Sequence, residues 1–227
     1  MKNTMTKPLQ FSFLLKRVTL AVAAALALST LAACVPLVIG GAMVGGTMMA
    51  IDRRTSGAQL EDEGIELRAA SRIRTNIGDR VHVNVTSYNR QVLITGEVPN
   101  EQDKQAVGQI ATTVENVTSV VNELVVSPIS TLSQRSNDVL ITGRIKASLI
   151  DSKDLVSSAF KVVTERGTVY LMGRVTAREA DRATAIARGT TGVQRVVRVF
   201  ETITEEALTR MMPAPAKPDA NKTKPAN

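Results

Sequence analysis

Two side chains in this chain of 227 residues stand out because each is the single one of its kind, Cys34 and His82. One cysteine excludes an internal disulfide framework and a zinc centre built from cysteines. One histidine excludes a metal cage built from several imidazoles. His82 alternates with valines in a segment typical of a strand, and we identify no partner acid or nucleophile for it. We therefore expect a surface histidine without a catalytic role.

Cys34 stands at the end of a segment whose composition changes in an ordered way. Residues 1–33 contain a basic start, an apolar run from Val18 to Leu28, and small residues at Ala32 and Ala33. This order is typical of a secretory signal, and the apolar run is shorter than the roughly 20 residues that span a bilayer. The thiol of Cys34 directly follows the expected cleavage point, where it is available for acylation.

The run Leu31-Ala32-Ala33-Cys34 resembles the bacterial lipobox. That resemblance implies that the cysteine thiol takes a diacylglyceryl group, that residues 1–33 are removed, and that the new amine is acylated. Val35 stands where a signal for inner-membrane retention would usually have Asp. The sorting rule therefore implies the outer membrane, with the protein lipid-anchored and facing the periplasm. The alternative is an ordinary signal peptide followed by an incidental cysteine.

Residues 34–59 are expected to form a tether between the acylated cysteine and the rest of the chain. The apolar stretch from Val35 to Ile51 is interrupted by Pro36 and four glycines, which disfavour a helix. Small residues at this spacing can also bring transmembrane helices together, so a location of residues 36–51 in the membrane stays open.

The net charge of +7 would suggest nucleic-acid binding if the excess of basic residues were spread over the whole chain, but much of it lies at the N-terminus. The first 33 residues hold four Lys or Arg and no acid, so the remainder carries only +3. We therefore expect no nucleic-acid partner. The chain also lacks a phosphate-binding loop, a dinucleotide fingerprint and a nucleophile elbow, so we expect neither enzymatic activity nor a cofactor.

An internal repeat occupies most of the remaining chain, at about residues 60–126 and 136–203. Each copy reads as helix, strand, strand, helix, strand, which predicts an α+β fold of two tandem αββαβ modules, each a three-stranded mixed sheet covered by two helices. In the first copy Leu67, Ala70, Ile73 and Ile77 are expected to form the inner face of the first helix. Residues 127–135 are expected to be a linker, and residues 204–227 a disordered tail rich in Pro, Ala and Lys.

The second copy resembles a BON domain, a small αββαβ module of bacterial envelope proteins. The resemblance lies in Gly167-Thr-Val-Tyr-Leu-Met-Gly-Arg-Val, then Glu179-Ala-Asp-Arg-Ala, then Gly192-Val-Gln-Arg-Val. With the lipobox and Asp52–Gly57, the two copies resemble dual-BON outer-membrane lipoproteins. This resemblance implies a protein without enzymatic activity that binds anionic phospholipid through its second module and maintains outer-membrane integrity. It also implies recruitment to cell-division sites and a link to the outer-membrane protein assembly machinery.

Charge also favours the second copy as the one that meets an anionic membrane. Residues 60–126 hold six Lys or Arg and ten Asp or Glu, whereas residues 142–200 hold eleven and five. Each basic residue near an anionic surface contributes about 1 kcal/mol. The alternative is that the surface charges are scattered and carry no function.

The first helix of the second copy supplies the candidate phospholipid-binding residues. With the copies aligned at an offset of 72, Leu140 takes the place of Arg68 and is therefore expected to be exposed. The candidates are Leu140, Gly143, Arg144, Lys146 and Ala147. An exposed apolar side chain beside cations suits shallow insertion among headgroups. In a competing interpretation Leu140 is buried against the first module or the linker. The alternative function is a periplasmic adaptor for outer-membrane protein assembly or cell-wall remodelling, with lipid contact incidental.

Overall fold

The computed structural model describes residues 52–211. The expected signal peptide, Cys34 and most of the expected tether lie outside these residues, as do residues 212–227. The described residues all belong to one compact unit, Met48–Asn227. This unit contains the hydrophobic cores of both modules.

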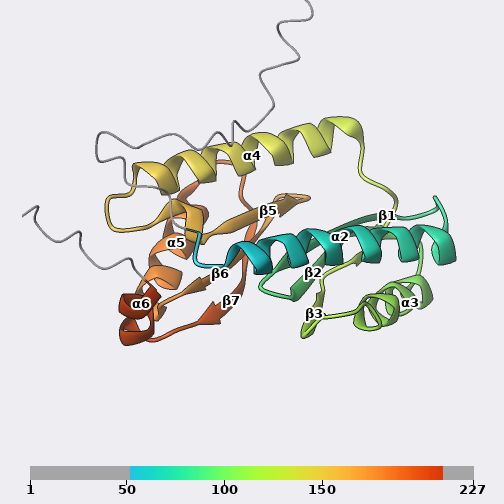
Figure 1. The fold of residues 1–227 in the computed structure, drawn as a ribbon. Helices are drawn as coiled ribbons and strands as arrows, with labels where there is room; N and C mark the ends of the chain where they lie inside the picture. The colour runs from blue at the N-terminus through green and yellow to red at the C-terminus, as the bar shows by residue number, and fades with distance from the viewer. Residues whose placement is uncertain (1–51, 212–227) are drawn as a thin grey trace, which may run out of the picture. The chain divides into compact units, whose positions relative to one another are not determined.

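The first module contains two helices and a mixed sheet (Figure 1). Strand β1 pairs antiparallel with β2, and β2 pairs parallel with β3 and with the short β4. Helices α2 and α3 pack against this sheet. The elements are α2 (Ser56–Ile77), β1 (His82–Tyr88), β2 (Gln91–Val98), α3 (Glu101–Thr112), β3 (Ser119–Asn122) and β4 (Val125–Val126).

The second module repeats this arrangement and adds a short helix at its end. Strand β5 pairs antiparallel with β6, and β6 pairs parallel with β7, in the order β5-β6-β7. The elements are α4 (Leu132–Asp151), β5 (Lys161–Glu165), β6 (Thr168–Val175), α5 (Ala177–Gly189), β7 (Arg195–Thr202) and α6 (Glu205–Met211). Two tandem αββαβ modules with mixed sheets confirm the predicted fold class, although the first sheet has four strands rather than three because β4 also pairs with β2.

A buried aspartate on the first helix of each module fixes the hairpin turn of the same module. Asp62 accepts hydrogen bonds from the backbone N–H groups of Asn89 and Arg90, both at positive φ. Asp138 accepts from those of Arg166 and Gly167, also at positive φ. A buried carboxylate is stable when it accepts several such bonds. This tertiary contact explains why an acid occupies the inner face of each helix.

Both faces of the central strands β2 and β6 are buried, each for a different reason. Val92, Ile94 and Val98 face the helices of their own module. Leu93, the alternate residue, instead packs with Tyr88 of β1 and with Tyr170 and Met172 of β6. Because side chains alternate along a strand, one face of each sheet packs on its helices and the other on the second sheet. The modules are therefore joined by direct sheet-to-sheet contact.

The structure corrects the predicted inner face of the first helix. Leu67 is 73% exposed and Ala70 is also exposed, whereas the buried face consists of Asp62, Ile65, Ala69, Ile73 and Ile77. The equivalent face of α4 consists of Asp138, Ile141, Ile145 and Leu149.

The copies therefore align at 76 residues in this helix, not 72, so that Leu140 matches Gly64 rather than Arg68. A shift of four residues is about one helical turn and preserves the apolar pattern. The N-caps Thr55 and Thr131 agree with the corrected offset.

Several expected boundaries also differ from the structure. Helix α2 begins at Ser56, inside the expected tether, and α4 begins at Leu132, inside the expected linker. Part of the tail expected to be disordered is the helix Glu205–Met211. Thr55 and Thr131 cap their helices through side-chain oxygens, which accept from backbone N–H groups and stabilise these earlier starts.

Candidate functional site

All five predicted phospholipid-binding residues lie on the exposed side of α4. Leu140 is 58% exposed, and Gly143, Arg144, Lys146 and Ala147 are also exposed. The opposite side of the helix is buried against the sheet of its own module through Ile141, Ile145 and Leu149. Leu140 is therefore not buried against the first module or the linker. Its exposure agrees with the prediction, although the alignment behind that prediction was one turn out of register.

The exposed side of α4 carries more apolar side chains than the sequence had indicated. Leu132, Val139 and Ile150 are all exposed and lie close to Leu140, Gly143 and Ala147 around the helix axis. With a rise of 1.5 Å per residue, this apolar stripe extends about 27 Å along the helix. The spacing of these apolar residues, at three, four and seven positions apart, could have revealed the stripe in the sequence. The alignment of the two copies at an offset of 72 instead of 76 hid it, because it compared the wrong positions of the two helices.

Cations flank the stripe, and no exposed acid interrupts it. Arg144 and Lys146 lie on its two sides, and Arg144 donates to the carbonyl oxygen of Thr191 at 3.3 Å. From Leu132 to Ile150 the single acid is Asp138, which is buried and bonded to the hairpin. Over residues 136–203 eleven Lys or Arg stand against seven Asp or Glu, a smaller excess than residues 142–200 alone suggest.

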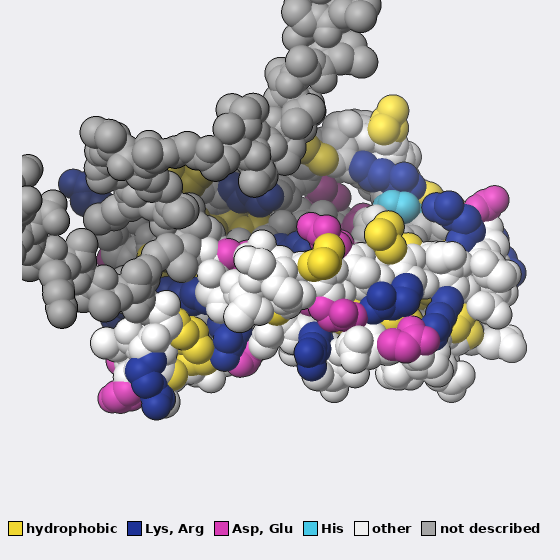
Figure 2. All heavy atoms as spheres, viewed as in Figure 1, with side chains coloured by type: hydrophobic (Ala, Val, Ile, Leu, Met, Phe, Trp, Pro, Cys, Tyr) yellow, Lys and Arg dark blue, Asp and Glu magenta, His cyan; other side chains and the backbone are white. Residues whose placement is uncertain are grey.

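The first module presents a different surface on its matching helix. Arg68 and Arg72 of α2 form ion pairs with Glu61 and Glu115, each with one N–O distance of 2.6 Å. Figure 2 shows acidic and basic side chains next to one another over this helix. Because these cations are already neutralised by neighbouring carboxylates, α2 has a weaker attraction for an anionic surface than α4 has.

The segment Asp52-Arg53-Arg54, predicted to belong to the tether, is packed into the fold. Arg53 forms two hydrogen bonds with Glu179 of the second module, at 2.7 and 2.6 Å, and both side chains are about 95% buried. Arg54 pairs with Asp62 of the first module at 2.8 Å and lies over the Tyr88 ring at 4.3 Å. We call these three residues the N-terminal clip, because consecutive arginines bind different modules.

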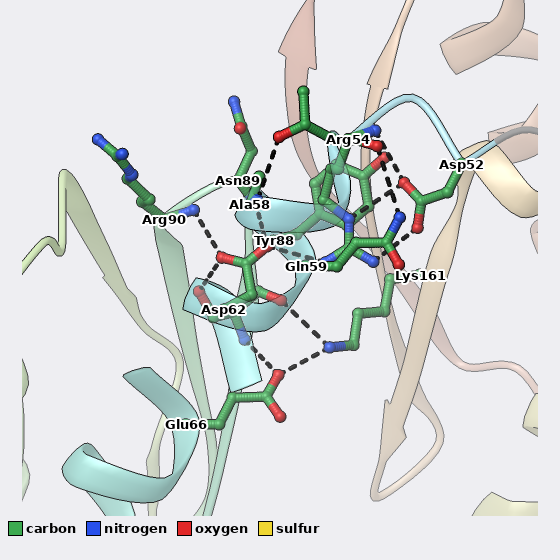
Figure 3. Close-up of polar contacts among 12 residues, drawn as sticks. Asp52, Arg54, Ala58, Gln59, Asp62, Glu66, Tyr88, Asn89, Arg90 and Lys161 are labelled. Atoms are coloured by element: carbon green, nitrogen blue, oxygen red, sulfur yellow. Dashed lines mark hydrogen bonds and ion pairs between the residues drawn. The ribbon is translucent and has the colours of Figure 1, made fainter. Parts of the chain in front are cut away.

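Figure 3 shows Asp52 and Arg54 of the clip beside Asp62, which also accepts hydrogen bonds from the backbone N–H groups of Asn89 and Arg90. Arg54 is held by Asp52 on one side and by Asp62 on the other, and Glu66 pairs with Lys161 of the second module at 2.7 Å. Burial favours a neutral carboxyl, yet hydrogen bonds from Ser87, Arg90 and Arg54 hold the pKa of Asp62 below its usual value. In the same way Arg53 and the N–H of Thr176 overcome burial and lower the pKa of Glu179.

His82 is not the unpartnered strand residue that the sequence suggested. Its side chain is 19% exposed, and its Nδ1 lies 2.8 Å from Oε2 of Glu97. Glu165 of the second module is also close. The missed signal was strand pairing, since β1 and β2 place His82 directly opposite Glu97.

None of the helices in the described part of the chain is both long and apolar enough to cross a bilayer.

Comparison with known proteins identifies the two modules. A family model for the BON domain matches residues 62–128 and 137–203. Outer membrane lipoprotein DolP of Haemophilus influenzae is 37% identical over 170 residues, which cover 74% of this chain and 88% of DolP. The 21 kDa hemolysin of Actinobacillus pleuropneumoniae is 32% identical over 152 residues, 66% of this chain and 78% of the hemolysin.

A more distant relative is Osmotically-inducible protein Y of Escherichia coli, 32% identical over 117 residues, which cover 50% of this chain and 58% of that protein. The two matched modules and the identity to DolP support an outer-membrane lipoprotein. The chain belongs to the BON-domain family.

Proposed function

We propose that this protein binds anionic phospholipid through the exposed side of α4 and thereby maintains the outer membrane, where it is anchored by acyl chains on Cys34 and faces the periplasm. The observation that carries the proposal is the apolar stripe of α4, flanked by Arg144 and Lys146 and free of exposed acid between Leu132 and Ile150. A role at division sites and contact with the outer-membrane protein assembly machinery belong to the same proposal, supported by the family resemblance alone.

The stripe suits shallow insertion because its apolar side chains are already exposed and need no unfolding. Full burial of a Leu or Ile side chain contributes about 1.5–3 kcal/mol, and partial burial in the headgroup region contributes part of that. Two cations add about 2 kcal/mol on an anionic surface, a preference of roughly thirtyfold over a zwitterionic one. These terms together predict binding that depends on both headgroup charge and the apolar stripe.

Vesicle flotation tests this directly with residues 48–227, a fragment that retains the clip and lacks Cys34. We expect flotation with phosphatidylglycerol vesicles and little with phosphatidylcholine vesicles. Leu140→Glu should weaken binding at least about tenfold, because the substitution removes apolar area and brings a carboxylate to the anionic surface. Arg144→Glu combined with Lys146→Glu should abolish the headgroup preference.

Leu67→Glu is the matched control, because Leu67 lies on the equivalent helix of the first module and is 73% exposed. This variant should float as the unaltered fragment does. Equal loss in Leu67→Glu and Leu140→Glu would remove α4 as the site. No flotation of the unaltered fragment would refute lipid recognition by the modules and favour the adaptor function, with lipid contact confined to the acyl anchor.

A further inference from the structure

The most unusual polar cluster in the described residues lies between the two sheets. His82 is on β1, Glu97 is directly opposite on β2, and Glu165 is the last residue of β5 in the second module. Glu97 is fully buried and Glu165 nearly so. Strand alternation directs these side chains away from the core of their own module and toward the other sheet.

Their ligand atoms lie close enough together to converge on one metal ion. Nδ1 of His82 is 2.8 Å from Oε2 of Glu97 and 4.0 Å from Oε1 of Glu165. One donor atom from each of the three residues lies within 4.8 Å of the other two. Zinc–nitrogen and zinc–carboxylate bonds are about 2.0–2.2 Å long, so tetrahedral ligand atoms around one ion are about 3.3–3.6 Å apart. When an ion binds, the hydrogen-bonded His82 and Glu97 therefore move slightly apart and Glu165 moves closer.

The negative charge of the cluster is only partly compensated by the protein. Oε1 of Glu97 is buried and forms no hydrogen bond within the described residues, and Arg166 Nη1 lies 3.6 Å from it. The two buried carboxylates thus share one guanidinium, which forms an ion pair with Glu97 but no hydrogen bond, and this arrangement favours the binding of a further cation.

Neighbouring polar groups orient the carboxylates as outer groups do in metal sites. Asn84 donates from Nδ2 to Oε2 of Glu165 at 2.9 Å, which leaves Oε1 directed toward His82. Ser130 donates from Oγ to Oε2 of Glu97 at 3.3 Å. Such second partners fix the ligand orientation and typically change metal affinity by ten- to a hundredfold.

The cluster is also accessible from solvent. His82, Asn84 and Glu165 line an open pocket of about 340 Å³. Its other wall is α4, through Arg135, Val139 and Thr142 among others. An ion can therefore reach the cluster without unfolding the module interface, and a coordinated water has room on the pocket side.

We propose that His82, Glu97 and Glu165 bind a divalent first-row transition metal ion, with Zn²⁺ as the representative. One imidazole and two carboxylates suit Zn²⁺ better than Ca²⁺ or Mg²⁺, which prefer oxygen ligands alone. Because two ligands come from the first module and one from the second, the ion bridges the two sheets. Its binding stabilises the contact between modules and holds the pocket wall formed by α4.

The test uses residues 48–227 without a histidine tag, titrated with ZnCl₂ by calorimetry and by NMR. His82 is the single histidine of the chain, so its ring nitrogens give one unambiguous set of signals. We expect a stoichiometry of one ion, a shift of the His82 ring nitrogens at the same equivalence point, and a rise in melting temperature with Zn²⁺. MgCl₂ at equal concentration should produce none of these changes.

Glu165→Gln and His82→Gln should each weaken Zn²⁺ binding at least about tenfold and remove the rise in melting temperature. Glu66→Gln is the matched control, since Glu66 is an acid at the same module boundary but pairs with Lys161. It should bind Zn²⁺ as the unaltered fragment does. Circular dichroism without metal checks that each variant folds.

Zn²⁺ binding that leaves the His82 signals unmoved would place the ion elsewhere and overturn the proposal. Equal affinity in Glu165→Gln and Glu66→Gln would do the same, as would no binding at micromolar protein. The NMR arm needs no variant, so the proposal stays testable even where a substituted cluster fails to fold.

Discussion

The N-terminal clip makes a quantitative prediction about stability. Arg53→Met keeps the length and apolar stem of the side chain but leaves Glu179 buried without its cation. Removing one partner of a buried ion pair costs about 3–5 kcal/mol. The Arg53–Glu179 pair is a buried ion pair of this kind, since its side chains are 5% and 3% exposed and it forms two hydrogen bonds. For a unit of this size the loss corresponds to a fall in melting temperature of roughly 6–20 °C.

Urea denaturation of residues 48–227 measures this loss, and a double-mutant cycle isolates the pair. Glu179→Gln is the second substitution, because a glutamine retains the capping box with Thr176. We expect a coupling energy of at least about 2 kcal/mol between the two positions. A fragment that begins at Gln59 lacks the clip and should lose at least as much stability as Arg53→Met.

Lys161→Met is the control for this experiment. Lys161 and Glu66 also join the two modules at 2.7 Å, but their side chains are 36% and 28% exposed. A solvent-exposed pair contributes about 0–1 kcal/mol, so this variant should change stability little. The reasoning fails if Arg53→Met costs less than about 1 kcal/mol, or if the coupling to Glu179 is near zero, because the clip would then not be docked as described.

Two further predictions concern strand packing and pH. Gly96 has φ +115° and a Cβ there would lie 2.0 Å from the His82 carbonyl oxygen, so Gly96→Ala should cost at least about 2 kcal/mol in urea denaturation. Gly143→Ala on open α4 should instead stabilise by up to about 1 kcal/mol, and equal effects would contradict the strand geometry. Because the folded pKa values of Asp62 and Glu179 are lowered, their stabilisation is present above about pH 4 and is lost as pH falls through those values. Melting temperature should therefore drop between about pH 5 and pH 2, and less in Glu179→Gln; an unchanged slope in that variant would refute the linkage.

The error in the first helix shows where periodicity loses information. Ile141, Ile145 and Leu149 are buried at intervals of four, so a shift of one turn matches almost as well. What separates the two alignments is the buried Asp on each helix and the hairpin turn it holds. A sequence pattern would rank an aspartate as exposed, because it cannot show that two backbone N–H groups from another element satisfy the carboxylate.

The candidate lipid-binding side of α4 was partly accessible from sequence. Arg144 and Lys146 could be singled out by charge, whereas Leu140 was singled out by an alignment one turn out of register and its exposure is known from the structure. Leu132, Val139 and Ile150 were missed, because apolar residues in a helix are ordinarily assigned to the core. Only the position of the buried face distinguishes an apolar residue that packs from one that faces solvent.

The sequence by itself determined the features that depend on near neighbours: the two copies, and the order of helices and strands within each copy. Only the tertiary structure decided how the two sheets meet. Arg53 and Glu179 are 126 residues apart, and Glu165 reaches His82 from the other module. These contacts depend on strand register and on the packing of one sheet face against the other. Local residue spacing does not encode that packing, because it shows which residues share a strand face but not which second surface covers that face.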